Sequence, residues 1–306
     1  MRFVRSFSDV FIAIGVGLLA LGLSATAALF GGGISFLGAA IVMALLAEYF
    51  GKKKRQHLPT LITALAFLIF TQRGLSVVIG DWDLGGGTTV AVTTLAAMLL
   101  FYWRVRLPFC MALIALSLLY LFFAVSEKFM PGILKSNFGW MILISGLATF
   151  VVALWYDTQD KHRTTRFADN AFWLHFTAAP LIIHGMAVIL VNLEPERLFG
   201  IVPVVTLDKG DAAGLMLMVL LVALVGLAIN RRALLVSSLG YAAFAIGFLM
   251  QDTGLGIGRV MAFTLLILGT AIIFLGAGWH RARNALIKIL PNWAIFPPPF
   301  DPSFKP

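Results

Sequence analysis

The stretch LPTLITALAFLIFTQRGLSVVI, from Leu58 to Ile79, is apolar over almost its whole length and follows the basic run Lys52-Lys53-Lys54-Arg55. A helix needs about 20 mostly apolar residues to cross about 30 Å of hydrocarbon. Only helices or closed barrels satisfy the backbone there, and this run is too long and continuous for a barrel strand. The stretch therefore predicts a transmembrane helix that begins beside a basic linker.

The same pattern recurs along the chain and predicts an all-α, polytopic transmembrane helical bundle of about ten spans. The predicted spans are residues 10–30, 33–50, 58–79, 87–103, 107–125, 138–156, 170–192, 212–229, 233–250 and 259–279. No linker is long enough for a separate soluble domain, so we expect one transmembrane domain over 1–280. Residues 281–306 are predicted to form a cytoplasmic tail, with a short interfacial helix over 281–290 followed by a proline-rich end.

Composition supports the membrane assignment and explains the high net charge. Hydrophobic residues make up 60% of the chain and charged residues 12%, against about 25% charged in soluble proteins. The formal charge of +9 comes from small basic groups at span ends, where membrane topology and anionic lipid head groups account for it. We therefore expect membrane lipids as partners, including anionic lipid at the cytoplasmic face, and no nucleic acid.

The basic residues alternate from one side of the predicted spans to the other. With the N-terminus inside, one face receives 17 of the 23 Lys and Arg residues: Arg2, Arg5, Lys52, Lys53, Lys54, Arg55, Arg104, Arg106, Lys161, Arg163, Arg166, Arg231, Arg232, Arg281, Arg283, Lys288 and Lys305. The positive-inside rule then predicts that both termini are cytoplasmic.

The seventh predicted span is the least uniformly apolar, because it carries His175, Pro180 and His184. Nine residues at about 100° each place the two histidines on nearly opposite faces of a straight helix. They would line one path only if Pro180 kinked or swivelled the helix. We predict a solute or proton path at these three residues.

Two interpretations of the histidines stay open. In one, they relay protons or bind a polar solute, because imidazole titrates near neutral pH. In the other, which is the more ordinary role, they are neutral and hydrogen-bonded between helices around Pro180. We predict no metal, because Asp, Glu and Cys partners are missing at this depth, and no haem or other cofactor. No catalytic constellation is visible, so an enzyme is not expected.

Polar residues at the opposite ends of the spans predict an outer gate. Arg73 lies in the outer half of the third span, while Asp252 and Arg259 flank the turn between the last two spans. Arg73 could pair with Asp252 or with Asp81, closing this side, or attract an anionic solute. The simpler alternative is that Arg73 extends its guanidinium to the lipid head groups.

Three segments carry a resemblance to known proteins. Phe172-Trp173-Leu174-His175 through Ala178-Ala179-Pro180-Leu181-Ile182-Ile183-His184, with Arg231-Arg232-Ala233-Leu234-Leu235-Val236 and Gly276-Ala277-Gly278-Trp279, resemble a group of uncharacterised bacterial multi-spanning inner-membrane proteins. This resemblance covers mainly residues 155–300 and implies bacterial origin but no activity. Length and topology alone are similar to the drug and metabolite transporter superfamily, without its acidic residue or inverted repeat.

These observations lead to two functional hypotheses. The first is a small-solute or proton-coupled transporter in the bacterial inner membrane. The second is a non-catalytic scaffold or accessory subunit whose basic cytoplasmic face docks a partner protein or anionic lipid. The scarcity of buried charge in the spans favours the second, and the polar groups in the seventh span favour the first.

Overall fold

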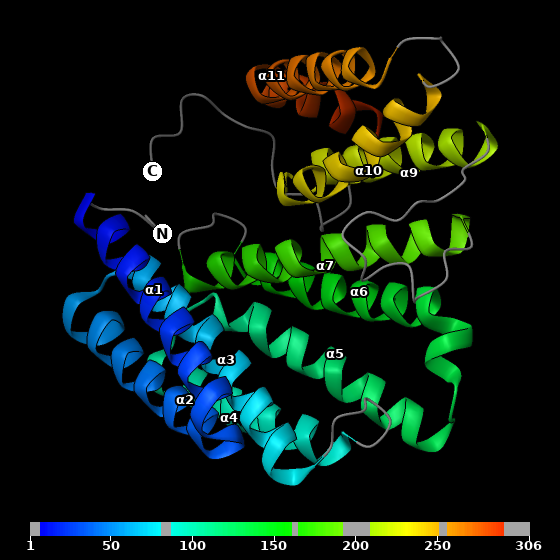
Figure 1. Ribbon diagram of the computed structural model, residues 1–306. Helices are drawn as coiled ribbons and strands as arrows, with labels where there is room; N and C mark the ends of the chain where they lie inside the picture. The colour runs from blue at the N-terminus through cyan, green and yellow to red at the C-terminus, as the bar shows by residue number, and fades with distance from the viewer. Residues whose placement is uncertain (1–6, 81–86, 161–164, 192–208, 251–255, 291–306) are drawn as a thin grey trace. The chain divides into compact units, whose positions relative to one another are not determined.

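In the computed structural model, residues 7–80, 87–160, 165–191, 209–250 and 256–290 are described, and every regular element among them is a helix (Figure 1). The helices are α1 (Phe7–Phe30), α2 (Gly32–Glu48), the π-helical turn η1 (Tyr49–Lys54), α3 (His57–Ile79), α4 (Thr88–Val105), α5 (Cys110–Phe129), α6 (Ile133–Gln159), α7 (Arg166–Val191), α9 (Lys209–Ala228), α10 (Ala233–Leu249) and α11 (Ile257–Ile289). The prediction of an all-α fold is confirmed for this part of the chain.

Nine of the helices in the described ranges are long and apolar enough to cross a membrane, so the chain is a multi-pass membrane protein. Each of the nine overlaps one predicted span. The remaining prediction, residues 233–250, coincides with α10, which has 17 residues. At about 1.5 Å per residue, α10 is about 26 Å long, slightly less than the hydrocarbon thickness.

The chain divides into two compact units, residues 1–136 and 137–306, where the sequence predicted one transmembrane domain over 1–280. The division falls inside α6, where Asn137 has non-helical backbone angles of φ −129° and ψ 22°. The sixth predicted span begins at the next residue, Phe138.

In the first unit, α2 and α3 approach each other backbone to backbone. A Cβ added to Gly33 would lie 2.7 Å from the carbonyl oxygen of Gly74, and one added to Gly74 would lie 3.0 Å from the carbonyl oxygen of Gly33. Glycine at both positions is what allows this distance, as small residues do between membrane helices. Beside this contact, Met43 and Phe70 are buried in the same apolar cluster.

Polar contacts gather at one end of the first unit. Glu48 pairs with Arg104 of α4 and lies 3.9 Å from the Lys52 ammonium, while Gln56 donates a 3.0 Å hydrogen bond from Nε2 to Asp9 Oδ1 in α1. The start of α1, the end of α2, the start of α3 and the end of α4 thus meet at one end. These are the ends that the sequence assigns to a common face.

In the second unit, α7 is the central helix and packs against α6, α9 and α10 (Figure 1). Toward α6 the approach is very close: a Cβ added to Gly185 would lie 2.6 Å from the backbone nitrogen of Leu143, and one added to Gly146 would lie 2.8 Å from that of Ile182. Toward α9 and α10, Ile183 is fully buried in an apolar cluster with Leu215, Met218 and Ala245. Packing on both sides orients the polar side chains of α7.

The last helix, α11, runs for 33 residues without a break. The helix predicted over residues 281–290 is therefore the continuation of α11 and not a separate element, because no glycine or proline follows Gly278 until Pro291. At about 1.5 Å per residue α11 is about 50 Å long, which exceeds the hydrocarbon thickness. The end of α11 therefore extends beyond the hydrocarbon layer, or the helix tilts within that layer. The predicted proline-rich end lies outside the described residues.

Candidate functional site

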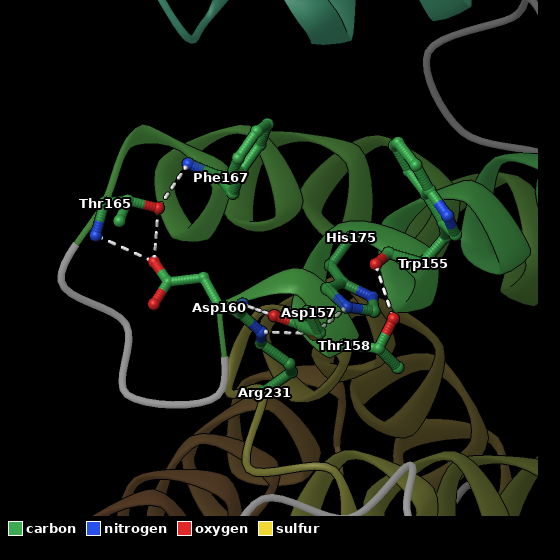
Figure 2. Close-up of polar contacts among 8 residues, drawn as sticks. All are labelled: Trp155, Asp157, Thr158, Asp160, Thr165, Phe167, His175 and Arg231. Atoms are coloured by element: carbon green, nitrogen blue, oxygen red, sulfur yellow. Dashed lines mark hydrogen bonds and ion pairs between the residues drawn. The ribbon is translucent and has the colours of Figure 1, made fainter.

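A network of three ionisable side chains joins three helices of the second unit (Figure 2). Asp157 lies in the last turn of α6, His175 in α7, and Arg231 in the turn before α10. His175 Nε2 lies 2.8 Å from Asp157 Oδ2, and Arg231 Nε donates to the same oxygen at 3.1 Å. Arg231 Nη2 also donates to Asp157 Oδ1. We call these three residues the α6–α7–α10 network.

The network is almost fully enclosed by protein. The exposed fractions are 0% for the His175 side chain, 9% for Asp157 and 7% for Arg231. The ring of Phe150 packs edge-on against the imidazole, with 5.2 Å between ring centroids and 70° between planes. Burial at this level is costly for a carboxylate or a guanidinium unless each meets a partner of opposite charge.

The hydrogen bonds define the role of each group. An ionised carboxylate only accepts hydrogen bonds, and the Arg231 guanidinium holds Asp157 in that form by occupying both carboxylate oxygens. The His175 Nε2 atom must then carry a proton and donate it toward Asp157 Oδ2. The network is thus an ion pair of Asp157 and Arg231 with the His175 imidazole fixed beside it. The negative charge of Asp157 and the positive charge of Arg231 cancel within the network.

A tight turn between α9 and α10 aims Arg231 at α6. Asn230 takes the left-handed conformation with φ 57°, and the Arg231 backbone N–H donates to the Gly226 carbonyl at 2.8 Å. A Cβ on Gly226 would come within 3.1 Å of the Arg231 carbonyl oxygen. A residue in this conformation after a helix reverses the chain sharply, as in a helix C-terminal cap.

A second set of contacts orders the start of α7 (Figure 2). Asp160 Oδ2 accepts hydrogen bonds of 2.7 Å from both the backbone N–H and the hydroxyl of Thr165. The Thr165 hydroxyl oxygen accepts from the Phe167 N–H at 3.2 Å. These bonds satisfy donors that the first turn of a helix leaves open. They support the position of α7 and carry no visible chemistry of their own.

The other histidine of α7 has a different partner. His184 Nδ1 forms a hydrogen bond with the phenol oxygen of Tyr241 in α10, and the ring centroids are 6.1 Å apart. Both side chains are half-buried. His175 lies nine residues earlier in α7, so at about 1.5 Å per residue this pair sits about 13–14 Å along the helix from the α6–α7–α10 network.

The structure does not bring the three predicted path residues together. His175 faces α6 and His184 faces α10, as the helical periodicity predicts, and the Pro180 side chain is exposed. α7 continues through Pro180 as one helix from Arg166 to Val191. The two histidines thus form separate polar sites on opposite sides of α7.

The predicted outer gate is only partly within the described structure. Arg73 is exposed on α3 of the first unit, and Arg259 is exposed in the first turn of α11 in the second unit. Asp252 and Asp81 lie outside the described residues. Within the described ranges, neither Arg73 nor Arg259 has an ion-pair partner for its side chain, so the gate stays a prediction.

Three residues of these sites escaped the sequence analysis. Asp157 follows the predicted sixth span directly. Arg231 was used only for topology and for the family resemblance, and Tyr241 was counted as part of an apolar span. An acidic residue on the basic face was the available signal for Asp157. Within the described ranges, no group of three or more His, Cys, Asp or Glu side chains could hold a metal ion.

Comparison with known protein families, with curated proteins and with solved structures found no match for this chain.

Proposed function

We propose that this chain is a proton-conducting permease of the bacterial inner membrane, which moves protons alone or with a small polar solute along α7 of the second unit. The observation that supports it is the pairing of His184 with Tyr241 inside apolar helices. Ionisable groups at membrane depth are rare because they are costly to insert, and where they occur they commonly form ion or proton pathways.

The chemistry of the His184–Tyr241 pair suits proton transfer. An imidazole has two ring nitrogens, and when one accepts from or donates to a phenol the other remains able to exchange a proton. The phenol can donate and accept in the same way. Because both side chains are half-buried, each ring keeps part of its surface outside the contact with the other.

In this proposal the α6–α7–α10 network is a positioning element. It joins the ends of three helices about 13–14 Å from the His184–Tyr241 pair. Its charges satisfy one another, so it closes this end of the second unit while α7 holds His184 beside α10. Asp157 and Arg231 are therefore positioning residues, and His184 and Tyr241 are the residues that contact the proton.

The proposal includes an orientation. Both termini lie on the cytoplasmic side, because the linkers that join the ends described above carry most of the Lys and Arg residues. The α6–α7–α10 network then lies near the cytoplasmic surface, and the His184–Tyr241 pair lies deeper in the membrane.

Proton flux into liposomes tests the permease. The full-length protein is reconstituted with an internal pH dye, the membrane potential is clamped with potassium and an ionophore, and an external acid jump is imposed. We expect faster acidification than in protein-free liposomes, with flux lost in His184→Gln and strongly reduced in Tyr241→Phe. The exposed His280→Gln variant is the matched control and should conduct normally. Wild-type flux equal to that of protein-free liposomes, or unchanged flux in His184→Gln, overturns the proposal.

A second candidate function is a non-catalytic scaffold or accessory subunit of a membrane complex. The observation in its favour is that the α6–α7–α10 network compensates its own charges, as a purely structural element would. Gentle solubilisation followed by mass measurement of the intact particle discriminates between the two. A particle that contains only this chain and lipid counts against a subunit, whereas a stoichiometric second protein supports it.

A further inference from the structure

A second cluster of side chains lies at the same end of the second unit as the α6–α7–α10 network. The Arg232 guanidinium carbon lies 5.2 Å from the centre of the Trp279 ring. The indole Nε1–H of Trp279 donates a 2.8 Å hydrogen bond to Asn230 Oδ1. Trp279 is 2% exposed, so the indole is a fixed platform between α11 and the turn before α10.

Arg232 differs from its neighbour Arg231 in its electrostatic environment. Arg231 is buried and neutralised by Asp157. Arg232 is exposed, and among the described residues no carboxylate pairs with it. A guanidinium that stacks on an aromatic face keeps its N–H donors free at the edge of the plane. Arg232 is thus a cation held over the indole, and no carboxylate of the described residues compensates its charge.

The surroundings of Arg232 are positively charged. The helix ends that meet here carry more basic than acidic residues within the described ranges. The basic residues are Arg166, Arg231, Arg232, Arg281, Arg283 and Lys288, and the acidic residues are Asp157, Asp160 and Asp169. An anion is therefore attracted to this end, and at Arg232 it meets a guanidinium of fixed orientation.

We propose that Arg232, supported by Trp279 and Asn230, binds the phosphate of an anionic phospholipid head group. The guanidinium fork matches the geometry of two phosphate oxygens. A lipid is favoured over a soluble phosphate because the site lies where α10 begins and where the tryptophan of α11 marks an apolar-to-polar boundary, the depth at which head groups lie. Lipid acyl chains would then contact the exposed apolar side chains of α11, such as Ile272 and Leu275.

This inference does not depend on transport, because lipid binding and proton flux are measured separately. The sequence predicted anionic lipid at this face in general, and this proposal names Arg232 over Trp279 as the residue that binds it. A scaffold could bind lipid at the same site. If the lipid-binding proposal failed, the His184–Tyr241 proposal would be unaffected.

Native mass spectrometry of the delipidated full-length protein tests the site, with phosphatidylglycerol as the probe and phosphatidylcholine as the zwitterionic comparison. One basic side chain near a membrane surface contributes enough attraction for a roughly fivefold change in anionic lipid affinity. We expect Arg232→Gln to weaken phosphatidylglycerol binding about fivefold, and Trp279→Leu to weaken it similarly by freeing the guanidinium. Binding of phosphatidylcholine should change little in either variant.

Two control variants separate binding at Arg232 from a general loss of charge and from a loss of folding. Arg259→Gln removes an equally exposed arginine from the other end of α11, where no aromatic ring of the described residues lies under it, and should bind phosphatidylglycerol like the wild type. Trp279→Phe keeps an aromatic face and should retain most of the affinity, even if Trp279→Leu reduces folding. Equal loss in Arg232→Gln and Arg259→Gln, or no loss in Arg232→Gln, overturns the proposal. Glycerol phosphate that competes as strongly as the lipid overturns the assignment to a lipid.

Discussion

The buried pair of Asp157 and Arg231 offers the most quantitative test of this structure. In Asp157→Asn the carboxylate charge is removed while the side-chain shape is kept. Arg231, whose side chain is 7% exposed, then remains as a buried cation without its counter-charge. The reverse change, Arg231→Gln, leaves Asp157 with the hydrogen bond from His175 as its one remaining side-chain partner among the described residues.

The expected cost follows from the burial of the pair. Removing one partner of a buried ion pair typically lowers the free energy of unfolding by about 3–5 kcal/mol, because the other charge is left uncompensated. We expect about 3 kcal/mol for each single variant, with Arg231→Gln at the lower end because His175 still donates to Asp157. The double variant leaves no unpaired charge, so it should cost no more than either single variant, about 3 kcal/mol, and the two sites are then coupled by about 3 kcal/mol.

The assay is reversible unfolding in mixed detergent micelles, followed by the loss of helical circular dichroism as the denaturing detergent increases. An exposed ion pair in the first unit provides the matched control. The side chains of Glu48 and Arg104 are 35% and 56% exposed, and exposed pairs contribute only about 0–1 kcal/mol. The cycle Glu48→Gln, Arg104→Gln should therefore show weak coupling in the same assay.

Additive single costs at Asp157 and Arg231 would refute the reasoning, because they would show that neither charge senses the loss of the other. A coupling no larger than that of the Glu48–Arg104 control would do the same. Either result would mean that water or lipid head groups reach the α6–α7–α10 network and screen it.

Two further predictions concern packing and orientation. Gly185→Ala places a methyl group against the α6 backbone and should destabilise the second unit by about 1–3 kcal/mol; Gly240→Ala, where a Cβ meets nothing within 4 Å, should be neutral or stabilising, and thermal unfolding of both variants measures the difference. In a background with Cys110→Ser, a membrane-impermeant maleimide should label Met130→Cys in intact cells but Lys53→Cys only after permeabilisation; the opposite pattern would reverse the proposed orientation.

The positions of the helices could be predicted closely from the sequence. Apolar runs as long as Leu58 to Ile79 have only one way to satisfy their backbone in lipid, so length and hydropathy suffice to locate them. The break at Asn137 and the continuation of α11 past Trp279 were less predictable. Both depend on whether a polar helical turn is continued, and the local sequence permits either outcome.

The candidate sites were predicted only in part. The sequence singled out His175 and His184, because imidazoles in an apolar helix are conspicuous, and helical periodicity placed them on opposite faces. Their partners were not predictable. Asp157 and Arg231 lie 18 and 56 residues from His175 in the sequence, and Tyr241 lies 57 residues from His184. No spacing rule links residues on different helices whose packing is unknown.

By itself, the sequence determined that this chain is a bundle of membrane-spanning helices, with its unusual polar groups on α7, because hydropathy acts locally and independently of the other helices. Only the tertiary structure decided which groups meet. The glycines at positions 146 and 185 bring α7 against α6, and the turn at Asn230 aims Arg231 at Asp157. Those contacts separate the two histidines into a compensated network and a half-buried pair, and this division follows from packing between helices.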